Sequence, residues 1–405
     1  MDSPSGPAPS AASTPHTFDA RPGAFAGLEV VEISLDAAGE MAGRLLAQYG
    51  ANVLKVEPPE GSPTRSIGPF AHGEEDPDHS LTFWYYNTSK RSEVLDPRQT
   101  NWHEELDRRL APADILILSC SPADIDSLGL DPTELAARHP RLVICTITPY
   151  GLDGPWSHYQ SCDLTNLAGG GVLASCGYDD HSVPPIRPGD NQSFHMAASF
   201  GLISILLALI QRDATGKGQL IDLSIHDSVA VSPELANPYY FYSEAVVHRQ
   251  TCRHAQPVPT QPALFETRDG RWVYFALILA DTKPWQSLVE WMDSMDLAAD
   301  LTDPAYETLD HRQANFSHIQ SILEVFFLLQ DAQSAYHEGQ RRGLPVAVIS
   351  SPDEVVHDEH LRAREFFEYV GTPDQPGGLY PGAPIRFSAY RSEPQRPAPR
   401  LGEAR

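Results

Sequence analysis

The chain has 405 residues and a formal net charge of −25, with 41% hydrophobic residues. That length allows two domains, and that apolar content is enough for a real core. The strong negative charge argues against binding to nucleic acid or to an anionic membrane surface, because like charges repel. Five Cys without CxxC spacing favour a reducing, cytoplasmic location without disulfides. The 16 His show no metal-ligand spacing, so no metal site is predicted.

Both ends of the chain have the composition of disordered segments. Residues 1–22 are rich in Pro, Ser and Ala, with neither a basic start nor an apolar stretch. We therefore expect a disordered tail there and not a signal peptide. Residues 392–405 have a similar composition, and we expect a second disordered tail.

The first part of the chain alternates strand and helix patterns. The expected strands and helices lie at 28–34, 37–49, 52–57, 114–118, 131–138 and 141–147. Strands joined through helices in this way require right-handed crossovers and a parallel sheet. The pattern therefore predicts an α/β fold built on an open parallel sheet.

A long apolar helix is expected at 191–211, followed by a turn and a strand at 219–224. Because it is apolar on nearly every side, we expect it to be buried all round. It is not predicted to span a membrane, since its apolar run is shorter than about 20 residues and is interrupted by polar side chains. The first N–H groups of a helix are unpaired, so the residues before it, Asp190 to Phe194, are well placed to meet an anionic or carbonyl ligand.

The pattern changes after residue 245. A hairpin is predicted at 265–275 around an Asp269-Gly270 turn. The further expected elements are helices at 285–292, 319–329 and 353–357 and a strand at 344–349. We therefore predict a large domain at 23–245, a smaller α+β domain at 246–350, and a segment at 351–391 that returns to the large domain.

Several sequence blocks resemble family III CoA-transferases of the carnitine and bile-acid type. They occur in the family's order and span about Gly27 to Ser388. The blocks are GLEVVEIS, LLAQYGANVLKVEPPEGSPTR, NTSKRSEVLD, LGLDPTELAARHPRLVICTITPYGLDGP, RDATGKGQLIDLSIHDS, FETRDGRWVYF and LRAREFF. The ordered set, more than any single block, is specific for this fold.

The resemblance implies a Rossmann-like large domain plus a small domain, with two subunits interlocked like linked rings into a homodimer. It also implies transfer of CoA from an acyl-CoA thioester to a free carboxylate, with CoA as substrate and product. In the family an Asp carboxylate attacks the thioester, and an enzyme thioester follows, which is covalent nucleophilic catalysis. A racemase branch of the same fold uses a His and an Asp as paired bases.

The position of the family's nucleophilic Asp, counted back from TGKGQ, falls on Phe194, which cannot attack a thioester. The nearest carboxylate is Asp190, one helical turn or about 6 Å away along a helix. Either Asp190 is a displaced nucleophile, or it caps the helix by accepting from the N–H of Gln192 or Ser193.

The racemase dipeptide is also altered, because Cys162 stands where the resemblance implies His, while Asp163 matches its Asp. Cys162 is either a nucleophile with a stabilised thiolate or a buried, inert thiol. Asp163 either takes part in chemistry or orients its loop. His195, next to Phe194, is either a general base or a core histidine.

The CoA side of the resemblance points to Ala38 in the first strand–helix turn, with Asp36 and Glu40 beside it. Carboxylates there repel a ligand that carries phosphates. The cations that remain are Arg65, Lys90 and Arg91, which either bind phosphate or are solvated surface charges. Two aromatic clusters either line an acyl pocket or serve packing and dimer contact: Tyr239, Tyr240 and Tyr242, and Trp84, Tyr85 and Tyr86.

Two hypotheses about function follow. The first is an acyl-CoA-dependent enzyme that acts on an acyl-CoA and a small carboxylic acid, most simply a CoA-transferase that uses Asp190. The second is a scaffold that has lost this chemistry and either catalyses a CoA-independent reaction or serves as an inactive partner subunit. They differ in whether CoA binds, because fold alone does not fix function.

Overall fold

The computed structural model describes residues 23–73, 75–233, 236–276, 282–372, 375–390 and 394–403. The tail expected at 1–22 lies outside the described residues. The chain divides into two compact units. The first unit consists of Met1–Gln160, Phe194–Ile225 and Ala363–Arg405, and the second of Ser161–Ser193 and His226–Arg362.

This division differs from the boundaries expected from sequence. The smaller unit includes 161–193, which composition had not separated from the large domain, and it begins again at 226 instead of 246. The chain rejoins the first unit at 363 instead of 351. The chain therefore passes between the two units several times. The amino-acid composition does not change at these points, so composition could not predict them.

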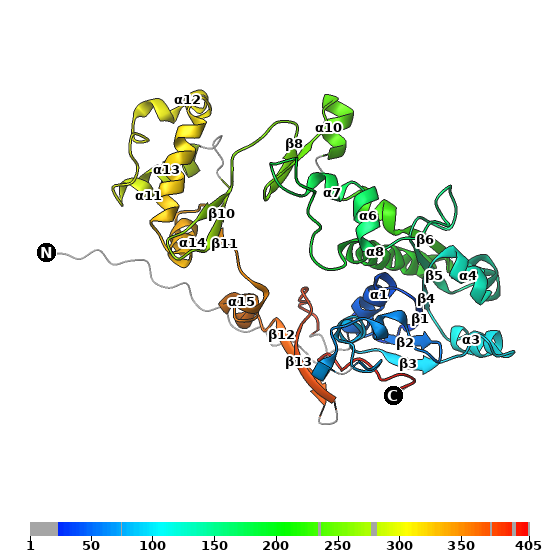
Figure 1. Ribbon diagram of the computed structural model, residues 1–405. Helices are drawn as coiled ribbons and strands as arrows, with labels where there is room; N and C mark the ends of the chain where they lie inside the picture. The colour runs from blue at the N-terminus through cyan, green and yellow to red at the C-terminus, as the bar shows by residue number, and fades with distance from the viewer. Residues whose placement is uncertain are drawn as a thin grey trace. The chain divides into compact units, whose positions relative to one another are not determined.

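The first unit is built on a six-stranded sheet in the order β3-β2-β1-β4-β5-β6 (Figure 1). Each neighbouring pair is parallel, so the predicted parallel α/β sheet is confirmed. The strands β4 and β5 are buried along their whole length, as expected where helices cover both faces. The strands are β1 (Glu29–Ser34), β2 (Asn52–Glu57), β3 (Arg91–Val94), β4 (Ile115–Ser119), β5 (Val143–Thr148) and β6 (Leu220–Ser224).

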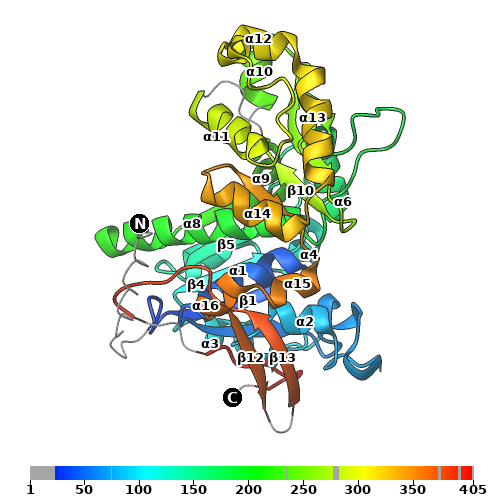
Figure 2. The same ribbon diagram turned by 90° about the vertical axis from the view of Figure 1, so that its left-hand side faces the viewer.

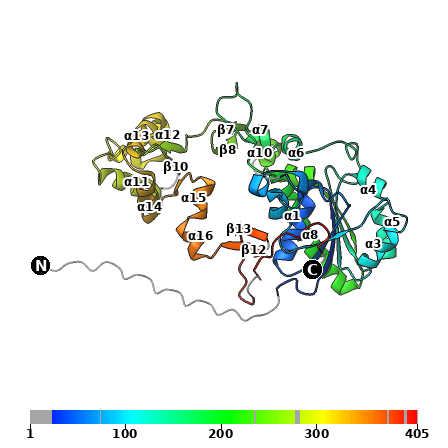
Figure 3. The same cartoon turned by 60° about the horizontal axis from the view of Figure 1, so that its bottom comes forward.

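Helices cover both faces of this sheet (Figure 3). One apolar core joins the sheet to α1 (Ala37–Gln48) and α8 (Gln192–Thr215). The core on the opposite face contains side chains of α3 (Trp102–Leu110), α4 (Pro122–Leu128) and α5 (Pro132–Arg138). The result is a three-layer α/β/α arrangement in which α1 and α8 share a face.

The expectation that α8 is buried on all sides is wrong. Its packed side is formed by small and branched side chains, Ala197, Ala198, Ile205, Ala208 and Leu209. The opposite side carries an apolar stripe whose exposed fraction rises from 38% at Phe200 through Ile203 and Leu207 to 68% at Ile210. By length and composition alone α8 is apolar enough to cross a membrane. A helix that is apolar on every side is thus not always buried on every side, because only one side of α8 packs against the sheet.

Smaller elements complete the first unit. They are the 3₁₀ helices η1 (Pro63–Ser66) and η2 (Ala71–Gly73), the helix α2 (Leu81–Tyr86), and the antiparallel hairpin of β12 (Phe367–Thr372) and β13 (Gln375–Pro381), seen in Figure 2. Phe83 and Trp84 of α2 form a small apolar cluster with Ala398.

The described part of the C-terminal segment, 394–403, is held by hydrogen bonds, so the disorder expected there is wrong. The N–H of Ser89 donates to Arg396 O at 2.9 Å, and that of Ser92 donates to Glu403 O at 3.1 Å. These donors lie at and just before β3, the edge strand of the sheet. A polar, Pro-rich segment is ordered here because an unpaired strand edge offers it partners.

The second unit has its own apolar core, in which Phe265, Trp291 and Phe327 pack together. The predicted hairpin around Asp269-Gly270 is confirmed by antiparallel pairing of β9 and β10 and by a positive φ of 71° at Gly270. The elements are α6 (Asp163–Gly169), α7 (Val172–Ser175), α9 (Ile225–Ala230), α10 (Ala236–Ser243), β7 (His248–Gln250), β8 (Arg253–Gln256), β9 (Leu264–Glu266), β10 (Trp272–Phe275), α11 (Thr282–Asp293), η3 (Pro304–Glu307), α12 (Leu309–Ala314), α13 (Phe316–Leu328), α14 (Ala332–Arg341), β11 (Val346–Val348), α15 (Pro352–Val356) and α16 (Glu359–Ala363).

Candidate functional site

The strand order of the parallel sheet reverses between β1 and β4. From β1 the chain builds outward through β2 and β3, and from β4 it builds the other way through β5 and β6. In open α/β sheets, ligands bind outside the carboxyl ends of the strands at such a reversal. Ser34 and Ser119 end these two strands in register with each other. The edge of the sheet beside them is therefore the first candidate site.

Buried hydroxyl groups line this edge of the sheet. Ser34 and Ser119 end β1 and β4, while Thr148 and Ser224 end β5 and β6 in register. The Oγ of Ser34 has no hydrogen-bond partner among the described residues. Gly39 lies directly over the strand ends, since a Cβ there would come within 2.3 Å of Ser34 Oγ and of Ser119 Cβ. Small residues thus let the first turn of α1 approach the sheet closely.

The N-terminus of α1 is capped by the chain itself. One carboxylate oxygen of Asp36 accepts from the N–H of Ala38 at 2.9 Å, from that of Gly39 at 3.2 Å, and from Ser119 Oγ at 2.7 Å. Burial raises the pKa of Asp36. The Ala38 donor that sequence assigned to CoA is therefore already occupied. A ligand anion at this turn would have to displace the Asp36 carboxylate.

The predicted phosphate-binding cations Arg65 and Lys90 have side chains that are 0% exposed. The guanidinium of Arg65 contacts Glu57 at 2.7 Å, and the ammonium of Lys90 contacts Glu32 at 2.7 Å. Both earlier interpretations, phosphate ligand and solvated surface charge, require exposure that these groups lack. Each cation instead neutralises a buried carboxylate, whose charge would be costly inside the protein without a partner.

Arg91 differs from these two cations. It begins the edge strand β3 and is partly exposed. Its Nε is buried and has no hydrogen-bond partner among the described residues. Arg91 is thus the residue of the predicted cationic set whose side chain is partly exposed, although its unpartnered Nε lies buried.

Asp163 anchors the start of α8, inside the second unit. One of its oxygens accepts from the N–H of Ser193 at 2.9 Å and from Ser193 Oγ at 2.8 Å. The other pairs with Arg187 at 2.9 Å, and Arg187 also donates to the carbonyl of Asp190 at 3.0 Å. The carboxylate on the first turn of α8 thus belongs to Asp163 and not to Asp190. Asp163 therefore has an orienting role in this structure.

The same network places two exposed nucleophile candidates near its ends. Asp190 is exposed, with a left-handed backbone φ of 62° that Asp tolerates better than most residues. Cys162, which precedes Asp163, is exposed as well, so the interpretation as a buried, inert thiol is wrong. Hydrogen bonds from Thr165 lower the pKa of the Cys162 thiol. The structure thus brings three of the four predicted catalytic residues into one hydrogen-bonded segment.

His195, the fourth candidate, lies in the first unit and pairs with Tyr86. The Tyr86 hydroxyl is 3.0 Å from His195 Nε2, and the two rings meet edge to face. Tyr86 is nearly buried on α2. Sequence had marked Tyr86 only as part of an aromatic cluster, since nothing in the spacing links positions so far apart. Phe194, where the resemblance led us to expect a nucleophile, packs against the apolar core beneath α8.

Metal chemistry has no visible basis in the part of the chain that the structure describes. There, no group of three or more His, Cys, Asp or Glu side chains converges in a way that would hold an ion.

Comparison with known proteins gives one consistent result. The profile of CoA-transferase family III matches residues 25–405. The succinyl-CoA:(R)-benzylsuccinate CoA-transferase subunit BbsE of Thauera aromatica is 29% identical, over 94% of this chain and 92% of the relative. The acetyl-CoA:oxalate CoA-transferase of Acetobacter aceti is 28% identical, over 96% and 95%. A CAIB/BAIF family protein from Brucella suis has a similar structure, with a TM-score of 0.80, 27% identity, and coverage of 95% and 97%.

Proposed function

Because the chain belongs to CoA-transferase family III, we propose that it exchanges CoA between an acyl-CoA thioester and a small carboxylic acid. The match along nearly the whole described chain is the observation that carries this proposal. Relatives at moderate identity are CoA-transferases, which makes this a transferase-class enzyme. The carboxyl edge beside β1 and β4 supports a ligand cleft where such sheets bind cofactors.

The proposal assigns the covalent step to Asp190. Its carboxylate attacks the thioester carbonyl, the C–S bond breaks, and CoA leaves as a thiolate while a mixed anhydride forms. The thiolate then attacks the anhydride at the Asp190 carbonyl, which releases the acid and leaves CoA bound to Asp190 as a thioester. Two observations support this role. The Asp190 side chain is exposed, and Arg187 donates a hydrogen bond to the main-chain carbonyl of Asp190.

Cys162 is the alternative nucleophile of the same proposal. Its thiolate would attack the thioester and expel the CoA thiolate, leaving an acyl group on the enzyme and no CoA. Its exposure and the lowered pKa of its thiol support this route. The two routes differ in which half of the substrate becomes attached to the protein.

Mass spectrometry of the intact protein after brief mixing with succinyl-CoA or acetyl-CoA separates these routes. We expect an adduct with the mass of CoA on wild type and none on Asp190→Asn. An acyl adduct that Cys162→Ser abolishes would assign the step to Cys162 instead. Asp213→Asn, which changes an exposed Asp at the far end of α8, is the matched control. If both adducts were absent and calorimetry showed no binding of CoA at millimolar concentration, the proposed function would be contradicted.

Two observations favour a second candidate function, that of a non-catalytic partner subunit. Phe194 fills the family's nucleophile position with a side chain that belongs to the core. The relative from Thauera aromatica is itself described as a subunit. This candidate predicts that the isolated protein binds CoA but forms no covalent adduct. A scaffold for a CoA-independent reaction predicts that CoA does not bind at all.

We also propose a homodimer. The apolar stripe of α8, formed by Phe200, Ile203, Leu207 and Ile210, is exposed on the isolated chain. Contiguous apolar surface of this kind marks association sites, and most soluble oligomers are symmetric dimers. A second copy of the chain is the partner that this proposal places on the stripe.

A further inference from the structure

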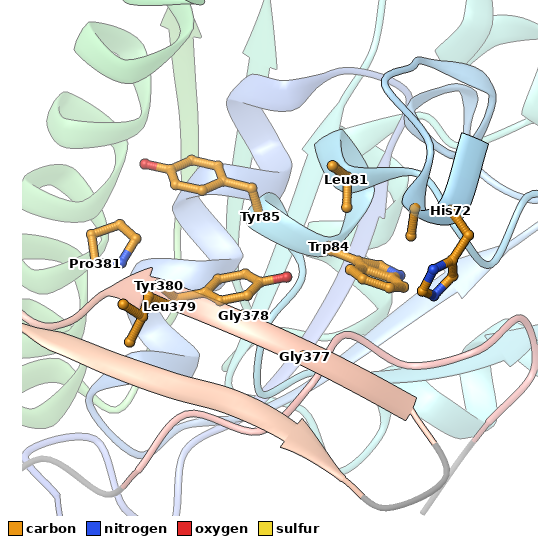
Figure 4. A pocket seen from close by; sticks show the side chains of 10 residues that line it. His72, Leu81, Trp84, Tyr85, Gly377, Gly378, Leu379, Tyr380 and Pro381 are labelled. Atoms are coloured by element: carbon orange, nitrogen blue, oxygen red, sulfur yellow. The ribbon is translucent and has the colours of Figure 1, made fainter. Parts of the chain in front are cut away.

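A pocket of about 410 Å³ lies between α2 and β13, within the first unit. Trp84 and Tyr85 contribute from α2 and Tyr380 from β13, and their rings surround the hollow (Figure 4). Leu81 and Leu379 add aliphatic lining. The volume falls in the range of small-molecule sites, and a mostly apolar lining with a few polar groups is typical of them.

A buried cation lies against the wall of this pocket. The guanidinium carbon of Arg44 is 4.2 Å from the ring centroid of Tyr85, and its Nη2 donates to Pro381 O at 3.3 Å. Tyr85 and Pro381 both line the pocket. Arg44 is only 3% exposed. A positive potential therefore acts on whatever fills the hollow.

Among the residues that the structure describes, Arg44 has no carboxylate partner, and its contacts are with the Tyr85 ring and the neutral oxygens of Pro381 and Gln395. Its Nε is buried without a hydrogen-bond partner. A buried, unpaired charge is costly, and it is normally offset by an opposite charge. An anionic group in the pocket would supply that charge.

Tyr380 adds a neutral hydrogen-bond donor. Burial raises the pKa of its hydroxyl to about 12, while the nearby Arg44 charge acts in the opposite direction. The phenol therefore stays protonated at neutral pH and can donate to an acceptor on a ligand. The pocket therefore has aromatic faces and the Tyr380 hydroxyl, with the Arg44 guanidinium against the wall that Tyr85 and Pro381 form.

From these contacts we infer that the pocket binds a carboxylate that carries an aromatic ring, with its ring among Trp84, Tyr85 and Tyr380 and its carboxylate toward Arg44. Aromatic rings prefer offset or edge-to-face contact with one another, and such pairs add stabilisation beyond the area that they bury. The inference concerns binding and stands apart from the CoA transfer proposed above. It holds or fails whether or not the chain transfers CoA.

Direct binding to the full-length protein tests this inference with three probes. We expect 3-phenylpropionate to bind saturably in calorimetry and to quench tryptophan fluorescence. We expect 3-phenylpropanol, which lacks the charge, and hexanoate, which lacks the ring, to bind at least tenfold more weakly. Equal affinity for acid and alcohol, tighter binding of hexanoate, or no saturable binding at millimolar concentration would each overturn the inference.

Variants locate the binding. Gly378 lines the pocket, and a Cβ added to it would meet no atom within 4 Å. It shares a face of β13 with Tyr380, so Gly378→Leu fills the hollow and should weaken 3-phenylpropionate at least tenfold. Arg44→Met should abolish the preference for acid over alcohol. Tyr369→Ser is the control, since Tyr369 lies on the same hairpin, is 69% exposed and does not line the pocket. Unchanged affinity in Gly378→Leu overturns the inference even if Arg44→Met fails to fold.

Discussion

At the scale of single residues, the Asp163 carboxylate does the work of a helix cap from a distance. It lies 30 positions before Ser193, yet it satisfies that residue's N–H and hydroxyl and pairs with Arg187. A cap from the chain just before the helix would hold only the helix. This one also holds the start of α6 and the segment that carries Asp190. The position of the candidate nucleophile Asp190 therefore depends on the contacts of Asp163 with Ser193 and Arg187.

Asp163→Ala tests this dependence. Removing the carboxylate leaves a buried N–H unpaired, which costs about 1–3 kcal/mol. We expect faster hydrogen exchange at the amide of Ser193 and loss of any adduct on Asp190. Asp163→Asn keeps an acceptor, and should preserve most of the amide protection while losing the Arg187 ion pair. Unchanged exchange in Asp163→Ala would show that the cap is dispensable.

Gly39 limits which side chains fit between the first turn of α1 and the carboxyl ends of β1 and β4. An Ala Cβ there would come within 2.3 Å of Ser34 Oγ and Ser119 Cβ, so α1 must lift from the strand ends. Overpacking of this kind typically costs about 1–3 kcal/mol. We expect Gly39→Ala to lower the thermal midpoint and to weaken CoA binding. Gly189→Ala, whose Cβ would meet nothing within 4 Å, is the matched control and should change neither.

At the scale of elements, α8 has two apolar sides, one packed against the sheet and one exposed on the isolated chain. The side with Ala197, Ala198 and Ala208 allows close approach to the sheet, because small side chains leave room for the backbone. The stripe on the other side is larger and is left exposed on the isolated chain. A helix of this composition suits an element placed between its own sheet and a partner surface.

The double variant Leu207→Gln/Ile210→Gln tests the stripe. These side chains are 63% and 68% exposed, so the change should leave folding of the chain intact. We expect light scattering to show a dimer for wild type and a rise in monomer for the variant. Gln211→Asn, on the same helix, should remain dimeric. A wild-type monomer would contradict the homodimer, and a dimeric variant would place the contact elsewhere.

At the scale of the whole molecule, a highly acidic protein keeps a set of ion pairs inside. The carboxylates of Glu32 and Glu57 and the cations of Lys55, Arg65 and Lys90 are all buried. Burial alone would raise the pKa of Glu57, but Arg65 and Lys55 lower it to about 2. Burial would likewise raise the pKa of Glu32, and Lys90 and Lys55 hold it below its usual range.

These shifts predict acid sensitivity with a definite sign. A carboxyl whose pKa is lower in the folded state stabilises the fold above its unfolded pKa. That stability is lost as the pH falls through the folded value. For Glu57 the window runs from about pH 4.5 to about 2, and the contribution is roughly 3 kcal/mol. We expect the urea midpoint of unfolding to fall steeply below pH 4.5 in wild type. In Glu57→Gln the midpoint should depend less steeply on pH. If the urea midpoint of Glu57→Gln depended on pH as steeply as that of wild type, the acid sensitivity would belong to other groups.

The predicted architecture follows from patterns that act over short range. Alternating apolar strands and amphipathic helices predicted the parallel sheet of the first unit, and Asp269-Gly270 predicted the β9–β10 hairpin of the second, because main-chain preferences and burial patterns act within a few residues. The position of Phe194 where a nucleophile was expected is also readable from the chain alone. So is the family, since ordered blocks survive wherever the fold needs them.

What only the tertiary structure decided are pairings across long separations. Tyr86 with His195, Asp163 with Ser193, and the burial of Lys90 each depend on which segments the fold brings together. The same charged or polar residue can be a surface group or an internal ion pair, and its local sequence is identical in both cases. Burial and partnership are properties of the whole packed chain, which is why Arg65 and Lys90, two of the cations considered as phosphate ligands, instead neutralise carboxylates inside it.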